Sequence, residues 1–228
     1  MEDKQTDGIA LPRAPIFPKK NGEDTRQCLM NSAKHLFAAK GYEGTTVKNI
    51  ADRAGVNISL VSYYFGGKEG IYQSCLEQLG TANLIAAQRI LKEPKSLEEF
   101  RVRLGLFIEQ NFDWYVQEPE LTSIVLRECE LASPMVLPLF ERTFLQVFFY
   151  LQSFLKAAKQ RGYLHEGLDV EVTASLIFGS ISHFARVKRL HKQLMNLTIR
   201  DPIYRKKVTD TLLQVILTGI LWESPKDI

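Results

Sequence analysis

From about Asp24 onward, the chain is organised in segments whose apolar residues recur every three or four positions. This is the period of an amphipathic α-helix, and the alternation of apolar and polar residues that marks a strand is absent. Glycine and proline fall between the long periodic segments, where they end one helix and allow the next to begin. The pattern therefore predicts an all-α protein of about nine helices.

The helix boundaries follow from caps, glycines and prolines. Gly41 ends the first helix, and Pro119 and Pro202 stand where a first-turn proline is tolerated. Residues 1–22, with three prolines, are predicted to form a flexible tail that could also track a DNA backbone. The predicted helices are 24–40, a short one after Thr46, 58–65, 68–91, 96–116, 119–131, 135–161, 169–190 and 202–222.

The second and third helices have the spacing of a helix-turn-helix. Two short helices that cross steeply need a small residue at the crossing, and Ala51 meets that need. Gly55 can adopt the positive φ of the tight turn between them. The core beneath them is predicted to hold Val47, Ile50, Val56, Val61 and Phe65. This leaves Asn57, Ser59, Ser62 and Tyr63 on the outer face of a helix short enough to enter a major groove.

An Ala-Gly turn by itself is also compatible with a helix pair that merely packs on a larger bundle. The wider pattern favours DNA binding, because the stretch Ala33 to Tyr72 resembles the N-terminal domain of the TetR family of bacterial regulators. The residues that carry the resemblance are Ala33, Leu36-Phe37, Lys40-Gly41-Tyr42, Thr45-Thr46-Val47, Ile50-Ala51, Ala54-Gly55-Val56, Tyr64-Phe65, Lys68-Glu69 and Ile71-Tyr72. The resemblance implies a DNA-binding domain at 23–70 and an effector-binding and dimerisation domain at 71–228.

By position, the resemblance implies two sets of DNA contacts. The residues expected to read bases are Asn57, Ile58, Ser59, Ser62 and Tyr63. Those expected to contact phosphates are Thr45, Thr46, Lys48, Tyr64 and Lys68. A helix N-terminus favours an anion, which suits Thr45 and Thr46. A lysine at a helix start, such as Lys68, opposes the dipole unless an anion arrives there. The family usually has tyrosine where this chain has Ser62, so the operator sequence stays open.

The last two predicted helices have wide apolar faces, more than one small core needs. The resemblance implies that they form a four-helix bundle with a second copy, which would place two reading helices about 34–36 Å apart on a palindromic operator. The alternative is that these faces belong to the core of one chain. The interface candidates are Leu176, Ser180, Phe184, Val187, Leu213, Ile216, Leu217 and Ile220.

A ligand pocket is expected among the fourth to eighth predicted helices, where polar or aromatic groups interrupt apolar stretches. The candidates are Asn111, Trp114, Gln146, Phe149, Tyr150 and His183. Four phenylalanines within eleven residues, from Phe144 to Phe154, favour a lipophilic or aromatic effector over a strongly charged one. Each of these residues taken singly is also compatible with plain core.

Composition limits the other classes of function. The net charge of +3 and the six basic against four acidic side chains of 24–70 permit DNA binding without proving it. Three widely spaced cysteines argue against disulfides or a zinc site, and no apolar run is long enough for a membrane span. These features predict a cytoplasmic protein without metal or cofactor. Nucleophile-elbow, zinc-protease and P-loop motifs are absent, which argues against an enzyme. An activator, an effector-independent regulator and a protein-interaction module stay open as alternatives.

Overall fold

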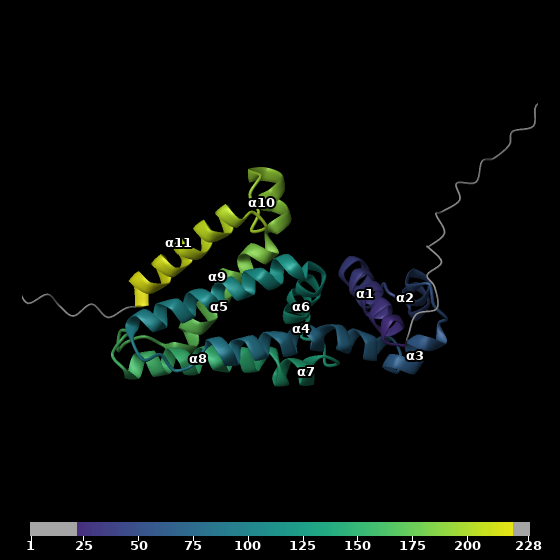
Figure 1. Ribbon diagram of the computed structural model, residues 1–228, viewed down its shortest axis with the longest axis horizontal. Coiled ribbons are helices and arrows are strands. Elements are labelled where there is room, and N and C mark those ends of the chain that lie inside the picture. The colour runs from purple at the N-terminus through teal and green to yellow at the C-terminus, as the bar shows by residue number, and fades with distance from the viewer. Residues whose placement is uncertain (1–21, 221–228) are drawn as a thin grey trace, which may run out of the picture. The chain divides into compact units, whose positions relative to one another are not determined.

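The computed structural model describes residues 22–220, which form eleven α-helices and no strand (Figure 1). This confirms the all-α class, although the chain has two more helices in that range than the sequence predicts. The chain divides into two compact units, Met1–Ile71 and Tyr72–Ile228. None of the helices within residues 22–220 is long and apolar enough to cross a lipid bilayer.

The first unit contains α1 (Gly22–Lys40), α2 (Val47–Ala54) and α3 (Ser59–Phe65). Helix α2 packs against both α1 and α3. The buried face of α1 includes Leu29, Ala33, Leu36 and Phe37, and α2 and α3 contribute Ile50, Ala51 and Val61 as buried residues. Val47, Val56 and Phe65 are only half-buried, so the predicted core beneath the helix-turn-helix is smaller than expected.

Local hydrogen bonds fix the ends of α2. The Thr46 hydroxyl accepts from the Asn49 amide at 3.1 Å, and the Asn49 side chain accepts from the Thr46 amide at 3.2 Å. This capping box satisfies two backbone donors that a helix start leaves unpaired. At the other end, Gly55 has φ of 69° and its amide donates back to Asp52. The predicted positive φ at Gly55 is confirmed, and it turns the chain toward α3.

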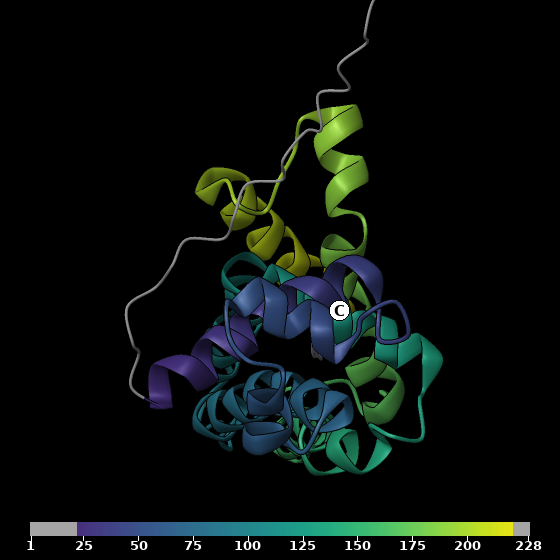
Figure 2. The same ribbon diagram turned by 90° about the vertical axis from the view of Figure 1, so that its right-hand side faces the viewer.

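The second unit contains most of α4 (Lys68–Ile90) and all the later helices. These are α5 (Leu97–Gln117), α6 (Pro119–Leu131), α7 (Leu137–Arg142), α8 (Phe144–Gln160), α9 (Val170–Arg186), α10 (Lys188–Met195) and α11 (Pro202–Ile220). Helix α5 packs against α6, α9 and α11, while α8 packs against α7 and α9. Helices α10 and α11 lie along one edge of this unit in both ribbon views (Figures 1 and 2).

Aromatic rings around α5 form the core of the second unit. Phe100 stacks on Phe154 of α8 with a centroid distance of 5.1 Å. Phe112 meets Phe184 of α9 edge to face at 5.8 Å. Edge-to-face and offset-stacked rings are the favourable geometries for aromatic pairs. Helix α5 is therefore held from both sides by rings that it buries.

Two predicted helices are interrupted in the structure. The segment predicted at 135–161 breaks at Thr143, whose φ of −126° and ψ of −82° lie outside the helical region, and so forms α7 and α8. A Cβ on Gly80 of α4 would lie 2.7 Å from the Thr143 hydroxyl, so α4 and the break approach each other closely. The segment predicted at 169–190 breaks at Val187 into α9 and α10. Both breaks depend on backbone geometry that apolar periodicity does not encode.

A buried carboxyl group links α6 to α4 within the second unit. The Tyr72 hydroxyl donates to Glu128 at 2.5 Å, and the Ser133 hydroxyl donates to the other carboxyl oxygen at 2.5 Å. Burial raises the pKa of the Tyr72 phenol far above its ordinary value, and the neighbouring Glu128 raises it further. The phenol therefore stays protonated and keeps donating, as a buried carboxyl group requires.

Replacing Gly55 tests the backbone requirement of the turn. A Cβ at Gly55 would meet nothing within 4 Å, so Gly55→Ala carries only the conformational penalty of a positive φ. We expect a loss of about 1–2 kcal/mol in the free energy of unfolding, measured by urea denaturation followed by circular dichroism. Gly179→Ala is the control, because Gly179 lies inside α9 with equally open space, and it should be neutral or stabilising. Equal effects of the two substitutions would contradict the requirement.

Candidate nucleic-acid interface and ligand cavity

The outer face of α3 presents the predicted base-reading groups to solvent. Tyr63 is 78% exposed and Ile58 is 50% exposed. Asn57, Ser59 and Ser62 are also exposed. Because α3 has only seven residues and buries just Val61 fully, most of its surface is available to a groove. The structure thus places all five predicted base-reading residues on one accessible segment.

Hydrogen bonds between Asn57 and Ser59 hold these two residues in place at the start of α3. The Asn57 side-chain oxygen accepts from the Ser59 amide at 2.9 Å and from the Ser59 hydroxyl at 2.8 Å. This contact stabilises the start of α3, because the free amides of a first turn need acceptors. It also fixes the amide flip of Asn57 and leaves its NH₂ group available as a donor to a base edge.

The predicted phosphate contacts differ in accessibility. Thr46 and Lys48 are exposed at the start of α2, and Lys68 at the start of α4 is half-buried over the Tyr42 ring, with its Nζ 4.1 Å from the ring centroid. A cation–π contact of this kind holds an ammonium group in place. Tyr64 is half-buried and meets the Tyr63 ring edge to face. All four side chains keep exposed surface and so stay predicted phosphate contacts.

Thr45 does not fit its predicted role. Its side chain is completely buried, and its hydroxyl donates to the Gly41 carbonyl at 2.8 Å. A side chain shielded in this way cannot contact a phosphate, so it serves the turn between α1 and α2 instead. We therefore remove Thr45 from the proposed phosphate contacts.

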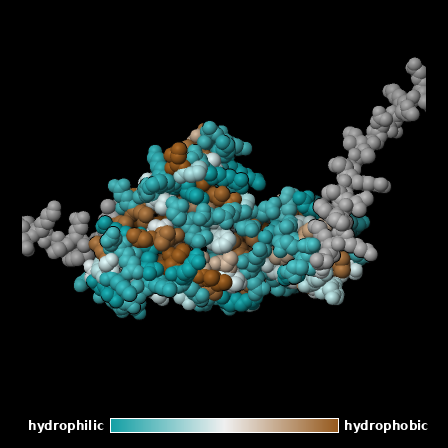
Figure 3. Space-filling model, viewed as in Figure 1, coloured by the Kyte–Doolittle hydropathy of each residue, from teal (hydrophilic) through white to brown (hydrophobic). Residues whose placement is uncertain are grey.

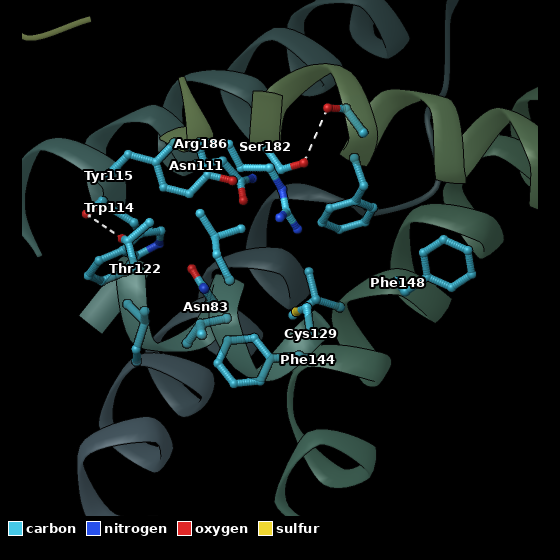
Figure 4. A pocket seen from close by; sticks show the side chains of 16 residues that line it. Asn83, Asn111, Trp114, Tyr115, Thr122, Cys129, Phe144, Phe148, Ser182 and Arg186 are labelled. Carbon is cyan, nitrogen blue, oxygen red and sulfur yellow. Dashed lines mark hydrogen bonds between the residues drawn. The ribbon is translucent and has the colours of Figure 1, made fainter. Parts of the chain in front are cut away.

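The second unit contains a partly open cavity of about 280 Å³ among α4, α5, α6, α8 and α9 (Figure 4). Its wall is mostly apolar and aromatic, with a few amide, hydroxyl and indole groups. In Figure 4, Trp114, Tyr115 and Thr122 lie toward one side, and Phe144 and Phe148 lie toward the other. The lining residues are Leu79, Asn83, Asn111, Trp114, Tyr115, Thr122, Val125, Leu126, Cys129, Phe144, Val147, Phe148, Phe178, Gly179, Ser182 and Arg186.

Only two of the six predicted ligand residues line this cavity, Asn111 and Trp114. Gln146 instead donates to the Glu141 carbonyl, and the Tyr150 hydroxyl accepts from Gln88. Phe149 and His183 are exposed on other faces of α8 and α9. These four predictions are wrong for this cavity, because the break at Thr143 and the rotation of α8 decide which residues face inward.

The sequence reasoning missed several polar lining residues. Asn83 lies on α4, Cys129 on α6, and Ser182 and Arg186 on α9. Single polar residues in amphipathic helices resemble ordinary surface positions, so the sequence gives no signal that they converge. Phe144 and Phe148 do line the cavity, in agreement with the aromatic character expected of this region.

The predicted dimer residues are divided between surface and core. Leu176 is 65% exposed, and Val215 of α11, which is not among the interface candidates, is 64% exposed. Phe184, Leu213, Ile216 and Leu217 are half-buried against the core of their own chain, Ser180 is half-buried, and Val187 forms the break between α9 and α10. The side chain of Ile220 lies outside the described residues, as does the 1–21 tail.

The described residues also decide whether this part of the chain could bind a metal ion. No group of three His, Cys, Asp or Glu side chains within 22–220 could hold a metal ion. The arrangement therefore combines an exposed short helix with hydrogen-bonding groups and, in the other unit, a mainly apolar cavity. This combination is typical of a DNA-binding protein with a separate site for a small molecule.

Comparison with known proteins agrees with this class. The family model described as bacterial regulatory proteins of the tetR family matches residues 29–75, which include α2, α3 and the start of α4. The chain is 21% identical to the transcriptional regulator RutR of Escherichia coli K12 over 201 residues, which cover 86% of this chain and 90% of RutR. Residues 29–75 thus match the DNA-binding domain of the tetR family of regulators, and most of the chain is similar to a transcriptional regulator of that kind.

Solved structures show the same fold over most of the chain. The regulator FadR of Bacillus subtilis, in complex with stearoyl-CoA, superposes with a TM-score of 0.69 at 21% identity, covering 85% of this chain and 98% of FadR. The ketosteroid regulator KstR2 of Mycobacterium tuberculosis superposes with a TM-score of 0.66 at 22% identity, covering 87% of this chain and 95% of KstR2. The helical second unit is therefore also shared with these regulators.

Two substitutions test whether Lys48 contacts phosphates and whether Tyr63 reads bases. Lys48→Ala should weaken binding to all DNA sequences and lower the salt slope of the binding constant by about 1, because one counterion fewer is released. Tyr63→Ala should weaken binding to a DNA site that the protein recognises specifically by about tenfold or more. It should change binding to unrelated DNA less. Fluorescence anisotropy at several salt concentrations measures both effects. Lys156→Ala, an exposed lysine of α8, is the control; parent-like binding by all three variants would refute the assignment.

Proposed function

We propose that the chain is a homodimeric repressor that binds a palindromic operator and is released from it by a small, mainly apolar effector. The observation that carries the proposal is the cavity of about 280 Å³ in the second unit of a protein that reads DNA with the first. On this proposal, residues 23–70 bind DNA, and residues 71–228 bind the effector and the second copy.

The surface of the second unit supports the proposed dimer. Apolar patches are visible on it (Figure 3). On α9, Val172 and Leu176 are 56% and 65% exposed, and on α11, Ile203 and Val215 are 83% and 64% exposed. Large exposed apolar side chains at helical spacing are typical of association surfaces. Two-fold association also matches a palindrome, because each copy then reads one half-site.

The cavity supports a compact effector of low polarity. Its volume lies near the lower end of the ~300–1,000 Å³ typical of small-molecule sites. Burial raises the pKa of the Tyr115 phenol well above its ordinary value, so this lining group is neutral near pH 7. FadR has been solved with stearoyl-CoA, which shows that this fold can admit a lipophilic ligand. Release of DNA then requires only ~1–3 kcal/mol of coupling between the two sites.

The operator and the dimer can be tested together. DNA fragments selected by the protein from the genome that encodes it should share a palindrome, and light scattering should give twice the 26.0 kDa chain mass. Leu176→Glu combined with Val215→Glu should lower that mass and weaken operator binding, because a buried charge opposes association. Ile85→Glu, at a 59% exposed site of α4, should change neither property. A parent mass equal to one chain would contradict the proposal.

The effector response can be tested by narrowing the cavity. Val125→Phe on α6 fills part of the cavity and should suppress the release of labelled operator by small aromatic compounds while leaving operator affinity unchanged. Val102→Phe is the matched control, because Val102 is 56% exposed on α5 and does not line the cavity. Anisotropy titrations with acetophenone and with stearoyl-CoA measure the response. Binding that no compound alters in the parent would instead indicate an effector-independent regulator.

A further inference from the structure

The polar groups of the cavity differ in whether they already have partners. The Asn111 amide donates to the Phe107 carbonyl at 2.8 Å, and the Thr122 hydroxyl donates to the Trp114 carbonyl at 3.4 Å. The Ser182 hydroxyl donates to the Gly179 carbonyl at 3.2 Å. These three donors are used within their own or adjacent helices. Asn83 also lines the cavity and adds an amide that a ligand can contact.

The indole of Trp114 differs from these three groups. Its Nε1–H is shielded from solvent and has no hydrogen-bond partner among the described residues. An indole N–H can only donate, so no rotation of a hydroxyl or exchange of roles can satisfy it within the protein. Buried polar groups are paired in nearly all native structures, and because Trp114 lines the cavity, an acceptor on a bound molecule would satisfy this donor.

The charge of the cavity wall restricts the kind of acceptor. Arg186 is the one charged side chain of the lining, and its guanidinium is paired with Glu130. A carboxylate ligand would have to share the Arg186 guanidinium with Glu130, or lose its hydration in a mainly apolar space. An uncharged acceptor avoids both costs.

The aromatic side chains that line the cavity favour a ligand with an aromatic ring. Phe148 and Phe178 lie 5.9 Å apart between centroids at the cavity, and Phe144 and Tyr115 add two further rings to the lining. Offset or edge-to-face contact with such rings favours a flat aromatic group. Rings on several helices thus form the wall to which Trp114, with its unpaired indole N–H, also belongs.

We propose that the effector is an uncharged aromatic compound whose carbonyl oxygen accepts a hydrogen bond from Trp114 Nε1–H. This inference rests on the proposed function, since it identifies the ligand class of the same cavity. The rings bind the aromatic part, and Trp114 selects compounds that carry an acceptor over hydrocarbons of the same shape. Specificity of this kind arises because a hydrocarbon leaves the buried donor unpaired.

Three probes of similar size test the proposal with the full chain. Acetophenone carries the ring and a carbonyl oxygen, ethylbenzene lacks the oxygen, and benzoate replaces it with a charge. The chain has two tryptophans, so Trp222→Phe leaves one indole N–H signal, that of Trp114, in a ¹⁵N correlation spectrum. Titration of this signal, together with calorimetry, gives the affinity of each probe.

We expect acetophenone to bind about tenfold more tightly than ethylbenzene and to move the indole proton downfield, as hydrogen bonding does. Benzoate should bind more weakly than acetophenone. Equal affinities of ketone and hydrocarbon, an unmoved indole signal, tightest binding by benzoate, or no binding by any probe would each overturn the proposal.

Trp114→Phe removes the donor and keeps an aromatic ring. In this variant the preference for acetophenone over ethylbenzene should fall to about one, whereas Phe149→Leu, at an exposed ring outside the cavity, should keep the parent ratio. A preserved preference in Trp114→Phe would contradict the role of the indole.

These measurements need no DNA, so they are independent of the proposed regulation. If acetophenone binds at Trp114 without releasing the operator, the proposal of an effector-released repressor is overturned. The proposal of an aromatic carbonyl ligand at Trp114 is then still supported. If other compounds release the operator while the Trp114 signal stays fixed, the repressor proposal is supported. The proposal of an aromatic carbonyl ligand at Trp114 is then overturned.

Discussion

The burial of aromatic rings around α5 is the constraint on which the second unit depends. Phe100, Phe107 and Phe112 are nearly or fully buried, and each meets a ring on α8 or α9. A cavity lined by Phe148 and Phe178 lies beside this packing, so the interactions that hold the helices together also shape the space proposed for an effector.

Helix α6 takes part in both the cavity and a buried hydrogen-bonded group. Its residues Thr122 and Val125 line the cavity, and one turn further Glu128 accepts from Tyr72 on α4. Breaking a hydrogen bond to a buried carboxyl group costs about 1.5–3 kcal/mol, so α6 and α4 tend to keep their contact. A ligand that displaced α6 would therefore act on α4 as well, which gives the proposed regulation a physical connection within the second unit.

In the first unit, by contrast, the helix ends are set by interactions between residues close together in the sequence. The Thr46–Asn49 capping box and the positive φ of Gly55 lie within ten residues of each other and set the bounds of α2. Short-range features of this kind are readable from sequence, and the exposed positions of α3 follow from its length and its single fully buried residue, Val61. Even here Thr45 was misplaced, since its burial depends on the packing of α1 against α2. Ser62 in the place of the usual tyrosine leaves the base preference to experiment.

The all-α class, most helix bounds, the turn at Gly55 and the exposed face of α3 are predictable from the sequence, because helix period, capping and glycine φ are local properties of the chain. The sequence also indicated an aromatic second unit, and Trp114 and Asn111 as lining residues. Only the tertiary structure decided the breaks at Thr143 and Val187, the burial of Phe184, and the convergence of Asn83, Ser182 and Arg186 on one cavity. Those outcomes depend on the rotation and approach of helices distant in sequence, as does the unpaired indole N–H of Trp114.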